Sequence, residues 1–131
     1  LWAAPLNKVY IQHPTLGDDE LAKAARATVG NLVDVVMAGA GVVEILPLGL
    51  SKATGLSLAA RRLGLRAADT IAFGDMPNDV EMLTWAGTSY AMGNAHPDVI
   101  AAASGRTVAN NDDGVAVIIE QILATRSEQQ L

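Results

Sequence analysis

Cysteine is absent from the 131 residues, which excludes disulfides, thiolate metal sites and a cysteine nucleophile. The absence says little about the compartment, and a reducing cytoplasm is the simpler expectation. Aromatic residues make up 4% of the chain, so its core has to be built from aliphatic side chains and alanine. A hydrophobic share of 50% and a mean hydropathy of +0.27 exclude wholesale disorder, and the length leaves no room for two large domains.

Charge and hydropathy argue against two kinds of partner. Nine basic and fourteen acidic side chains give a net charge of −5 without any basic stripe, so we expect no nucleic-acid partner. No apolar run reaches membrane-spanning length and no basic stretch opens a signal peptide, so we expect no membrane partner. The chain begins at Leu1 rather than at methionine, which favours a trimmed or partial product.

The first third of the chain predicts a small α+β unit. Alternating and β-branched patterns predict strands at 7–12, 32–37 and 41–46, the last two joined through residues 38–40 as a hairpin. An amphipathic pattern that opens with acidic residues predicts a helix at 18–29. This order favours antiparallel pairing.

From residue 48 onward helices and strands alternate. The pattern predicts helices at 51–63, 78–85, 97–103 and 112–124, strands at 70–73, 88–92 and 106–109, and a frayed tail at 125–131. Alternation implies parallel strands joined by right-handed crossovers. We therefore predict an α/β fold whose boundary lies near residue 47, with an α+β part over 1–47 and a parallel-sheet part over 48–131.

The segment from Gly74 to Asp79 carries the strongest chemical signal. It follows a predicted buried strand, and ligands bind at the carboxyl ends of parallel strands. The carboxylates of Asp75 and Asp79 and the amide of Asn78 are oxygen donors that suit Mg²⁺. A structural interpretation stays open beside this one, in which Asn78 or Asp79 caps the next helix and Asp75 forms a turn.

Two other polar residues stand at unusual positions. Lys52 falls in the first turn of a predicted helix, where the helix dipole disfavours a cation by about 0.3–1 kcal/mol. It is either a solvated surface residue or one that meets an anion, since a lysine beside a helix N-terminus is a common phosphate site. Glu44 interrupts an apolar strand; it either makes hydrogen bonds at the edge of the core or faces a cleft, and the pattern does not decide between these.

Together these motifs resemble the C-terminal part of a haloacid dehalogenase (HAD) superfamily phosphatase, of the Cof-type subfamily with a type IIB cap. The resemblance covers about residues 42–123 and rests on VEILPLGLSK at 43–52, DTIAFGDMPNDVEML at 69–83, AMGNA at 91–95 and NNDDGVA at 110–116. It implies half of a HAD-like Rossmannoid α/β/α core with parallel strands, preceded by the end of an α+β type IIB cap.

The resemblance also implies a role for four residues. Lys52 would be catalytic, since it matches the lysine that neutralises the transferring phosphoryl group, and it would bind the phosphate together with Asn78. Asp75 would be catalytic as a ligand of Mg²⁺, the implied cofactor, and Asp79 would support the metal site. The implied substrate is a small phosphorylated metabolite, whose identity the cap sets in this family.

One part of the family's site does not occur in this sequence. The family's nucleophile and general acid come from a D-x-D motif, and no D-x-D occurs in the 131 residues. We therefore expect a Mg²⁺-dependent phosphatase that is present here without its nucleophile-bearing N-terminal half and is inactive as this chain alone. The alternative is a non-catalytic fragment, or a subunit that completes a HAD site with a partner chain. The missing half or a homo-oligomer would cover the exposed edge of the sheet.

Overall fold

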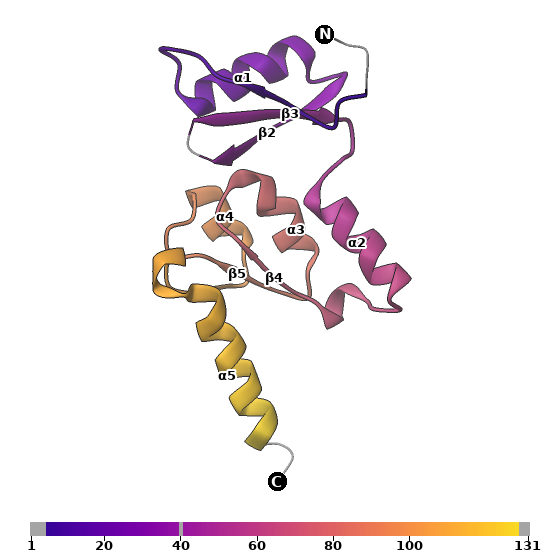
Figure 1. Cartoon of the computed structure of the whole chain (residues 1–131), viewed down its shortest axis with the longest axis vertical. Helices are drawn as coiled ribbons and strands as arrows, with labels where there is room; N and C mark the ends of the chain where they lie inside the picture. The colour runs from indigo at the N-terminus through magenta and orange to yellow at the C-terminus, as the bar shows by residue number, and fades with distance from the viewer. Residues whose placement is uncertain (1–4, 40, 129–131) are drawn as a thin grey trace.

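The computed structural model of the chain describes residues 5–39 and 41–128 and contains two three-stranded sheets, one antiparallel and one parallel. Figure 1 shows the antiparallel sheet and α1 at one end of the molecule, the parallel sheet below it and α5 leading away at the other end. The strands are β1 (Val9–Ile11), β2 (Val33–Gly39), β3 (Val42–Pro47), β4 (Ile71–Gly74), β5 (Thr88–Ala91) and β6 (Gly105–Arg106). The helices are α1 (Asp18–Val29), α2 (Lys52–Arg62), α3 (Val80–Trp85), α4 (Pro97–Ala102) and α5 (Gly114–Glu128), with 3-10 turns η1 (Ala67–Asp69), η2 (Pro77–Asp79) and η3 (Asn110–Asp112).

The antiparallel sheet has the strand order β1-β3-β2 and uses its two faces differently. Side chains alternate between the faces of a strand. Val35, Met37 and Val43 therefore face α1, where they pack with Ala22 as a small core. The other face, which we call the open face, carries Tyr10, Asp34, Val36, Glu44 and Leu46 and is turned toward the rest of the molecule.

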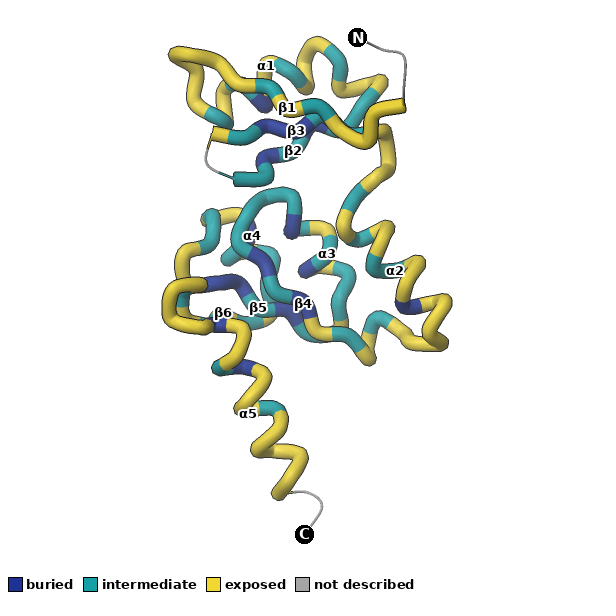
Figure 2. Tube along the Cα trace, in the orientation of Figure 1, coloured by how far each residue is buried: buried dark blue, intermediate teal, exposed yellow. Residues whose placement is uncertain are grey.

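The parallel sheet has the order β4-β5-β6 and confirms the predicted parallel pairing. Ala72 and Ala91 lie on one face and pack against Leu83 of α3 and Val99 of α4, which are dark blue in Figure 2. The other face carries Phe73 and Tyr90, whose stacked rings lie 5.7 Å apart between centroids. Small residues on the first face let the two short helices approach the strands closely.

Most predicted elements are confirmed, and three differ. The strand expected at 106–109 is reduced to β6, because regular pairing with β5 ends at Ala91; single backbone hydrogen bonds follow, from Thr107 N to Ala91 O and from Gly93 N to Val108 O. The helix expected at 78–85 is divided into η2 and α3, with Pro77 opening the 3-10 turn. Residues 125–128, expected to fray, continue α5, since their segment contains no glycine or proline that would end a helix. The expected hairpin link includes residue 40, which lies outside the described residues.

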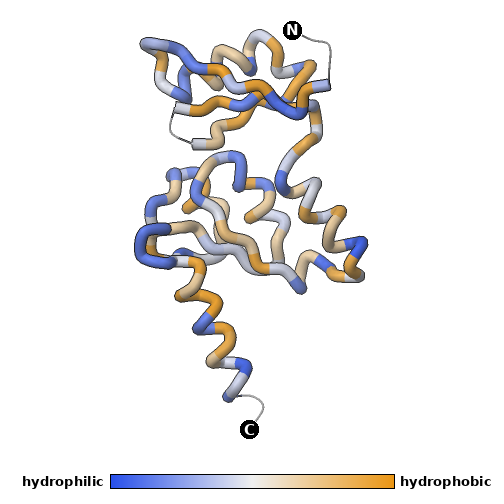
Figure 3. Tube along the Cα trace, viewed as in Figure 1, coloured by the Kyte–Doolittle hydropathy of each residue, from blue (hydrophilic) through white to orange (hydrophobic). Residues whose placement is uncertain are grey.

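Both outer edges of the parallel sheet and one side of α5 lack a partner within residues 5–39 and 41–128. β4 and β6 each pair with β5 along one edge and with no described strand along the other. Val115, Ile119 and Leu123 of α5 are exposed, and Figure 3 shows this helix as largely apolar. Among the described residues, no helix has the length and apolar character needed to cross a membrane. Residues 48–51 connect the two halves, and the domain boundary at residue 47 stays a prediction.

Candidate functional site

The loop that follows β4 is organised by the carboxylate of Asp79. One oxygen accepts hydrogen bonds from the backbone N–H groups of Asp75 and Met76, at 3.0 and 3.1 Å. The other oxygen forms an ion pair with the Nζ of Lys52. Asp79 thereby ties the end of β4 and the turn η2 to the start of α2.

This ion pair explains the unusual position of Lys52. The side chain of Asp79 is 5% exposed and that of Lys52 is 48% exposed, so a buried carboxylate is held by a cation that reaches the surface. Burying a carboxylate is unfavourable unless charged and hydrogen-bonding partners surround it. Lys52 thus meets a carboxylate of the protein itself, and its place in a phosphate site stays a prediction. Ser51 caps α2 by accepting a hydrogen bond from Thr54 N at 3.2 Å.

Gly74 leaves the space that the Asp79 side chain occupies. A Cβ at Gly74 would lie 2.5 Å from the Cβ of Asp79 and 2.9 Å from its Cγ. We expect Gly74→Ala to lower the free energy of unfolding by about 1–3 kcal/mol, because the added methyl forces Asp79 away from its partners. Gly55→Ala is the matched control: its Cβ would meet nothing within 4 Å, and alanine should stabilise α2 by about 0.5–1 kcal/mol. Thermal unfolding of both variants measures the difference, and equal stabilities would contradict this account of Gly74.

The carboxylate of Asp75 lies where the segments after the three parallel strands meet. Its Oδ2 is 3.5 Å from the Nδ2 of Asn94, which follows β5. The Oδ1 of Asn94 accepts a hydrogen bond at 3.0 Å from the backbone N–H of Asn110, which follows β6. The sequence analysis gave Asn94 no role of its own and missed this bridge. The position of Asn94 could have indicated this contact, because Asn94 follows β5 just as Asp75 follows β4.

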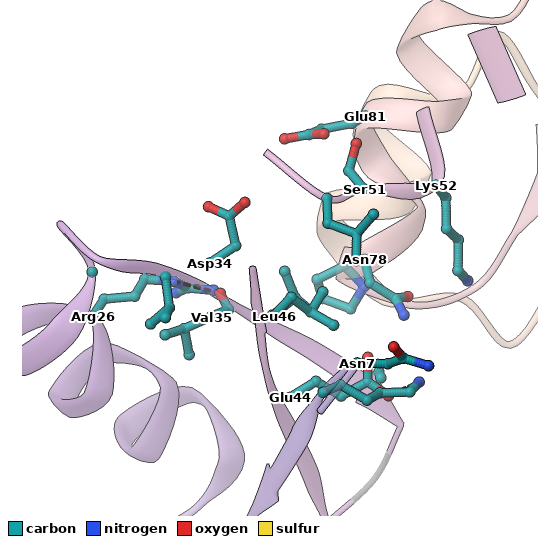
Figure 4. A pocket seen from close by; sticks show the side chains of 17 residues that line it. Asn7, Arg26, Asp34, Val35, Glu44, Leu46, Ser51, Lys52, Asn78 and Glu81 are labelled. Carbon is teal, nitrogen blue, oxygen red and sulfur yellow. Dashed lines mark hydrogen bonds and ion pairs between the residues drawn. The ribbon is translucent and has the colours of Figure 1, made fainter. Parts of the chain in front are cut away.

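A cavity of about 860 Å³ separates the open face from this loop (Figure 4). Lys52 and Asn78 line it from one side, whereas Asp75 and Asp79 are not among its lining residues. The Oδ1 of Asn78 is a buried side-chain oxygen that accepts no hydrogen bond from the described residues. From the other side the cavity is lined by residues of the antiparallel half, among them Asn7, Lys8, Asp34, Glu44 and Leu46.

The oxygen atoms available near the end of β4 are of the chemical type that binds a hard cation. Asp75 and Asp79 offer carboxylate oxygens, the ligands that Mg²⁺ prefers. The described part of the chain gathers no group of three or more histidine, aspartate, glutamate or cysteine residues that could hold a metal ion. Both oxygens of Asp79 already accept bonds from Lys52 and the loop backbone, whereas Asp75 has one long contact to Asn94. Asp75 is therefore the better candidate for a direct ligand, and Asp79 for its support.

The fold and these motifs agree with what is known of similar proteins. The chain matches the family described as haloacid dehalogenase-like hydrolase over residues 2–119, and it belongs to that family. The resemblance seen in the sequence is thereby confirmed.

Three relatives match between half and nine-tenths of this chain. Each match spans less than half of the relative's own length. The 5-amino-6-(5-phospho-D-ribitylamino)uracil phosphatase YbjI of Escherichia coli (strain K12) is 36% identical over 104 residues, which are 79% of this chain and 38% of that protein. The HMP-PP phosphatase of Serratia proteamaculans (strain 568) is 43% identical over 67 residues, 51% of this chain and 24% of that protein. The crystal structure of SMU.1108c from Streptococcus mutans UA159 has a TM-score of 0.81 at 32% identity and covers 89% of this chain and 44% of that one.

Proposed function

We propose that residues 1–131 form part of a Mg²⁺-dependent phosphatase that acts on small phosphorylated metabolites. The observation that carries this proposal is the Lys52–Asp79 ion pair at the loop that follows β4, beside a cavity of ligand size that Lys52 and Asn78 line. The names of two relatives, both phosphatases, support it. The cytoplasm as compartment stays a prediction.

Phosphoryl transfer requires positioned positive charge more than proton chemistry. The ammonium of Lys52, held at the start of α2 by Asp79, would bind an oxygen of the transferring phosphoryl group. Asn78 lines the same cavity, and its amide would contact the bound phosphate. Asp75, with Asp79 in support, would hold Mg²⁺, which supplies further charge neutralisation when bound. Asn94 would position Asp75 through its amide.

The attacking aspartate has to come from outside residues 1–131, because no D-x-D occurs in them. β4 and β6 each have an edge that pairs with no described strand, and we place the missing strand at the edge of β4 because Asp75 follows that strand. A parallel strand added there would end beside Asp75, since carboxyl ends of parallel strands meet at one edge. The complete enzyme, as we use the term, is residues 1–131 together with such an aspartate-bearing segment. The same edge also favours the second candidate, a subunit that completes the site with a partner chain.

Asp75→Asn in the complete enzyme tests the metal assignment. A neutral amide is a poorer ligand for a hard cation, so we expect half-maximal activity to require about 10–100-fold more Mg²⁺. Phosphate release from p-nitrophenyl phosphate, measured against Mg²⁺ concentration, reports this shift. Asp19→Asn, an exposed carboxylate in α1, is the matched control and should leave the Mg²⁺ dependence unchanged. An unaltered Mg²⁺ requirement in the Asp75 variant would remove Asp75 from the metal site.

A further inference from the structure

Asn94 is an exposed residue whose side chain is nevertheless engaged at both ends of its amide. Its Oδ1 accepts a hydrogen bond from the backbone N–H of Asn110 at 3.0 Å, and its Nδ2 lies 3.5 Å from the Oδ2 of Asp75. An amide has one acceptor end and one donor end, so the bond from Asn110 turns the donor end toward Asp75. The contact with Asp75 is long, and it therefore depends on the orientation that Asn110 gives to Asn94.

Main-chain hydrogen bonds hold the backbone on both sides of this contact. The carbonyl oxygen of Asp75 accepts from the N–H of His96 at 2.8 Å, and the N–H of Gly93 donates to the oxygen of Val108 at 3.1 Å. The approach at Gly93 is close, because a Cβ there would lie 2.7 Å from the nitrogen of Ala109. The side chain of Asp75 is thus the part of this junction that can still rotate, and the amide of Asn94 restricts it.

The contact with Asn94 makes the two oxygens of the Asp75 carboxylate different. Oδ2 faces the amide, whereas Oδ1 accepts no hydrogen bond from residues 5–39 and 41–128. A cation at Asp75 would therefore find one oxygen open and the other engaged. This difference matters for the choice of metal. Mg²⁺ requires a near-ideal octahedron of oxygen ligands, whereas the larger Ca²⁺ has a flexible geometry and often takes both oxygens of one carboxylate.

We infer that Asn94 favours Mg²⁺ over Ca²⁺ by restricting Asp75 to binding the cation through one oxygen. Asn94 acts as a positioning residue, since it contacts the proposed ligand and not the cation. The backbone N–H of Asn110 supports it by fixing the amide. The inference rests on the proposed function, because it takes Asp75 as the ligand of the cation, and it extends that function to the selectivity of the site.

Calorimetric titration of the complete enzyme with MgCl₂ and, separately, with CaCl₂ tests this role without requiring turnover. The quantity of interest is the ratio of the two affinities. We expect Asn94→Ala to shift this ratio toward Ca²⁺ by about tenfold, because Asp75 becomes free to offer both oxygens and loses the group that orients it for Mg²⁺. Since Asn94 is exposed, alanine should leave the fold intact.

Asn110 gives a second test that keeps the side chain of Asn94 in place. Asn110 opens η3, and the preceding Ala109 is extended with a ψ of 165°, so proline suits this position. Asn110→Pro removes the N–H that orients Asn94, whereas Asn110→Ala keeps it, and both variants lose the same side chain. We expect the proline variant to shift the affinity ratio toward Ca²⁺ by about 3–10-fold and the alanine variant, the matched control, to shift it by less than about twofold.

The outcomes separate this inference from the proposed function. An unchanged ratio in Asn94→Ala, or equal weakening of both cations, overturns the role of Asn94, even if the complete enzyme releases phosphate with Mg²⁺. Equal ratios in Asn110→Pro and Asn110→Ala overturn the support by Asn110, and wild type that binds neither cation overturns the inference as a whole. A ratio that depends on Asn94, without phosphate release, supports the inference and counts against the phosphatase. Melting temperatures check that all three variants fold.

Discussion

Residues 1–131 by themselves should release no phosphate from phosphomonoesters, whereas the complete enzyme should do so when Mg²⁺ is present. Lys52 and Asp75 can lower the charge penalty of the transition state, but neither is placed to attack phosphorus in the family's scheme. Losing one electrostatic contact typically lowers a rate by about 10²–10³-fold. Losing the attacking group removes the covalent route altogether, so its effect should be larger.

The measurement is phosphate release from p-nitrophenyl phosphate and a panel of sugar phosphates, with and without EDTA. The complete enzyme with the first aspartate of its D-x-D changed to asparagine is the matched control, because it keeps the β4 edge covered while removing the nucleophile. Adding the aspartate-bearing segment as a separate chain tests the subunit alternative. The assigned mechanism would be wrong if residues 1–131 alone were fully active, or if EDTA did not reduce the activity of the complete enzyme.

Local patterns predicted most of the fold, and the shortest element shows where they fail. The amphipathic pattern and its acidic opening predicted the helix at 18–29, and α1 has these bounds in the structure. Alternation of helices with apolar strands predicted the parallel pairing of β4 and β5. β6 has two residues, too few for any periodicity, and its length depends on where its neighbour β5 ends. The extent of strand pairing depends on both strands, so it cannot be predicted from the sequence of one of them.

The sequence indicated which residues belong to the candidate site, but it did not indicate which of them contact one another. Lys52 and Asp79 stand out separately in the sequence, 27 residues apart, and nothing local indicates that they meet. They meet because the start of α2 lies against η2, a consequence of helix packing. Glu44 stayed open between a structural and a cleft-facing interpretation, and the register of the antiparallel sheet places it on the cavity. Judged from the sequence alone, Lys52 contributes little to folding, and the ion pair changes that expectation.

Lys52→Met in the complete enzyme should lower both turnover and stability. Turnover should fall by about 10²–10³-fold, because the ammonium that we propose to bind the phosphoryl group is lost. The free energy of unfolding should fall by about 1–3 kcal/mol, since the buried carboxylate of Asp79 loses its cation. This is less than the ~3–5 kcal/mol typical of breaking a fully buried pair, because Lys52 is half exposed and water screens its charge.

A second substitution separates the two effects of Lys52. Combining Lys52→Met with Asp79→Asn removes the unpaired buried charge, and the asparagine oxygen can still accept from the backbone of Asp75 and Met76. We expect the double variant to recover part of the lost stability while turnover stays low, because stability depends on the pair and catalysis on the ammonium. Lys23→Met, an exposed lysine of α1, controls for general loss of charge. Kinetics and urea unfolding of wild type, Lys52→Met, Asp79→Asn and the double variant give the coupling between Lys52 and Asp79. If Lys52→Met left stability unchanged and lowered turnover by less than tenfold, the ion pair would contribute neither to the fold nor to phosphoryl transfer.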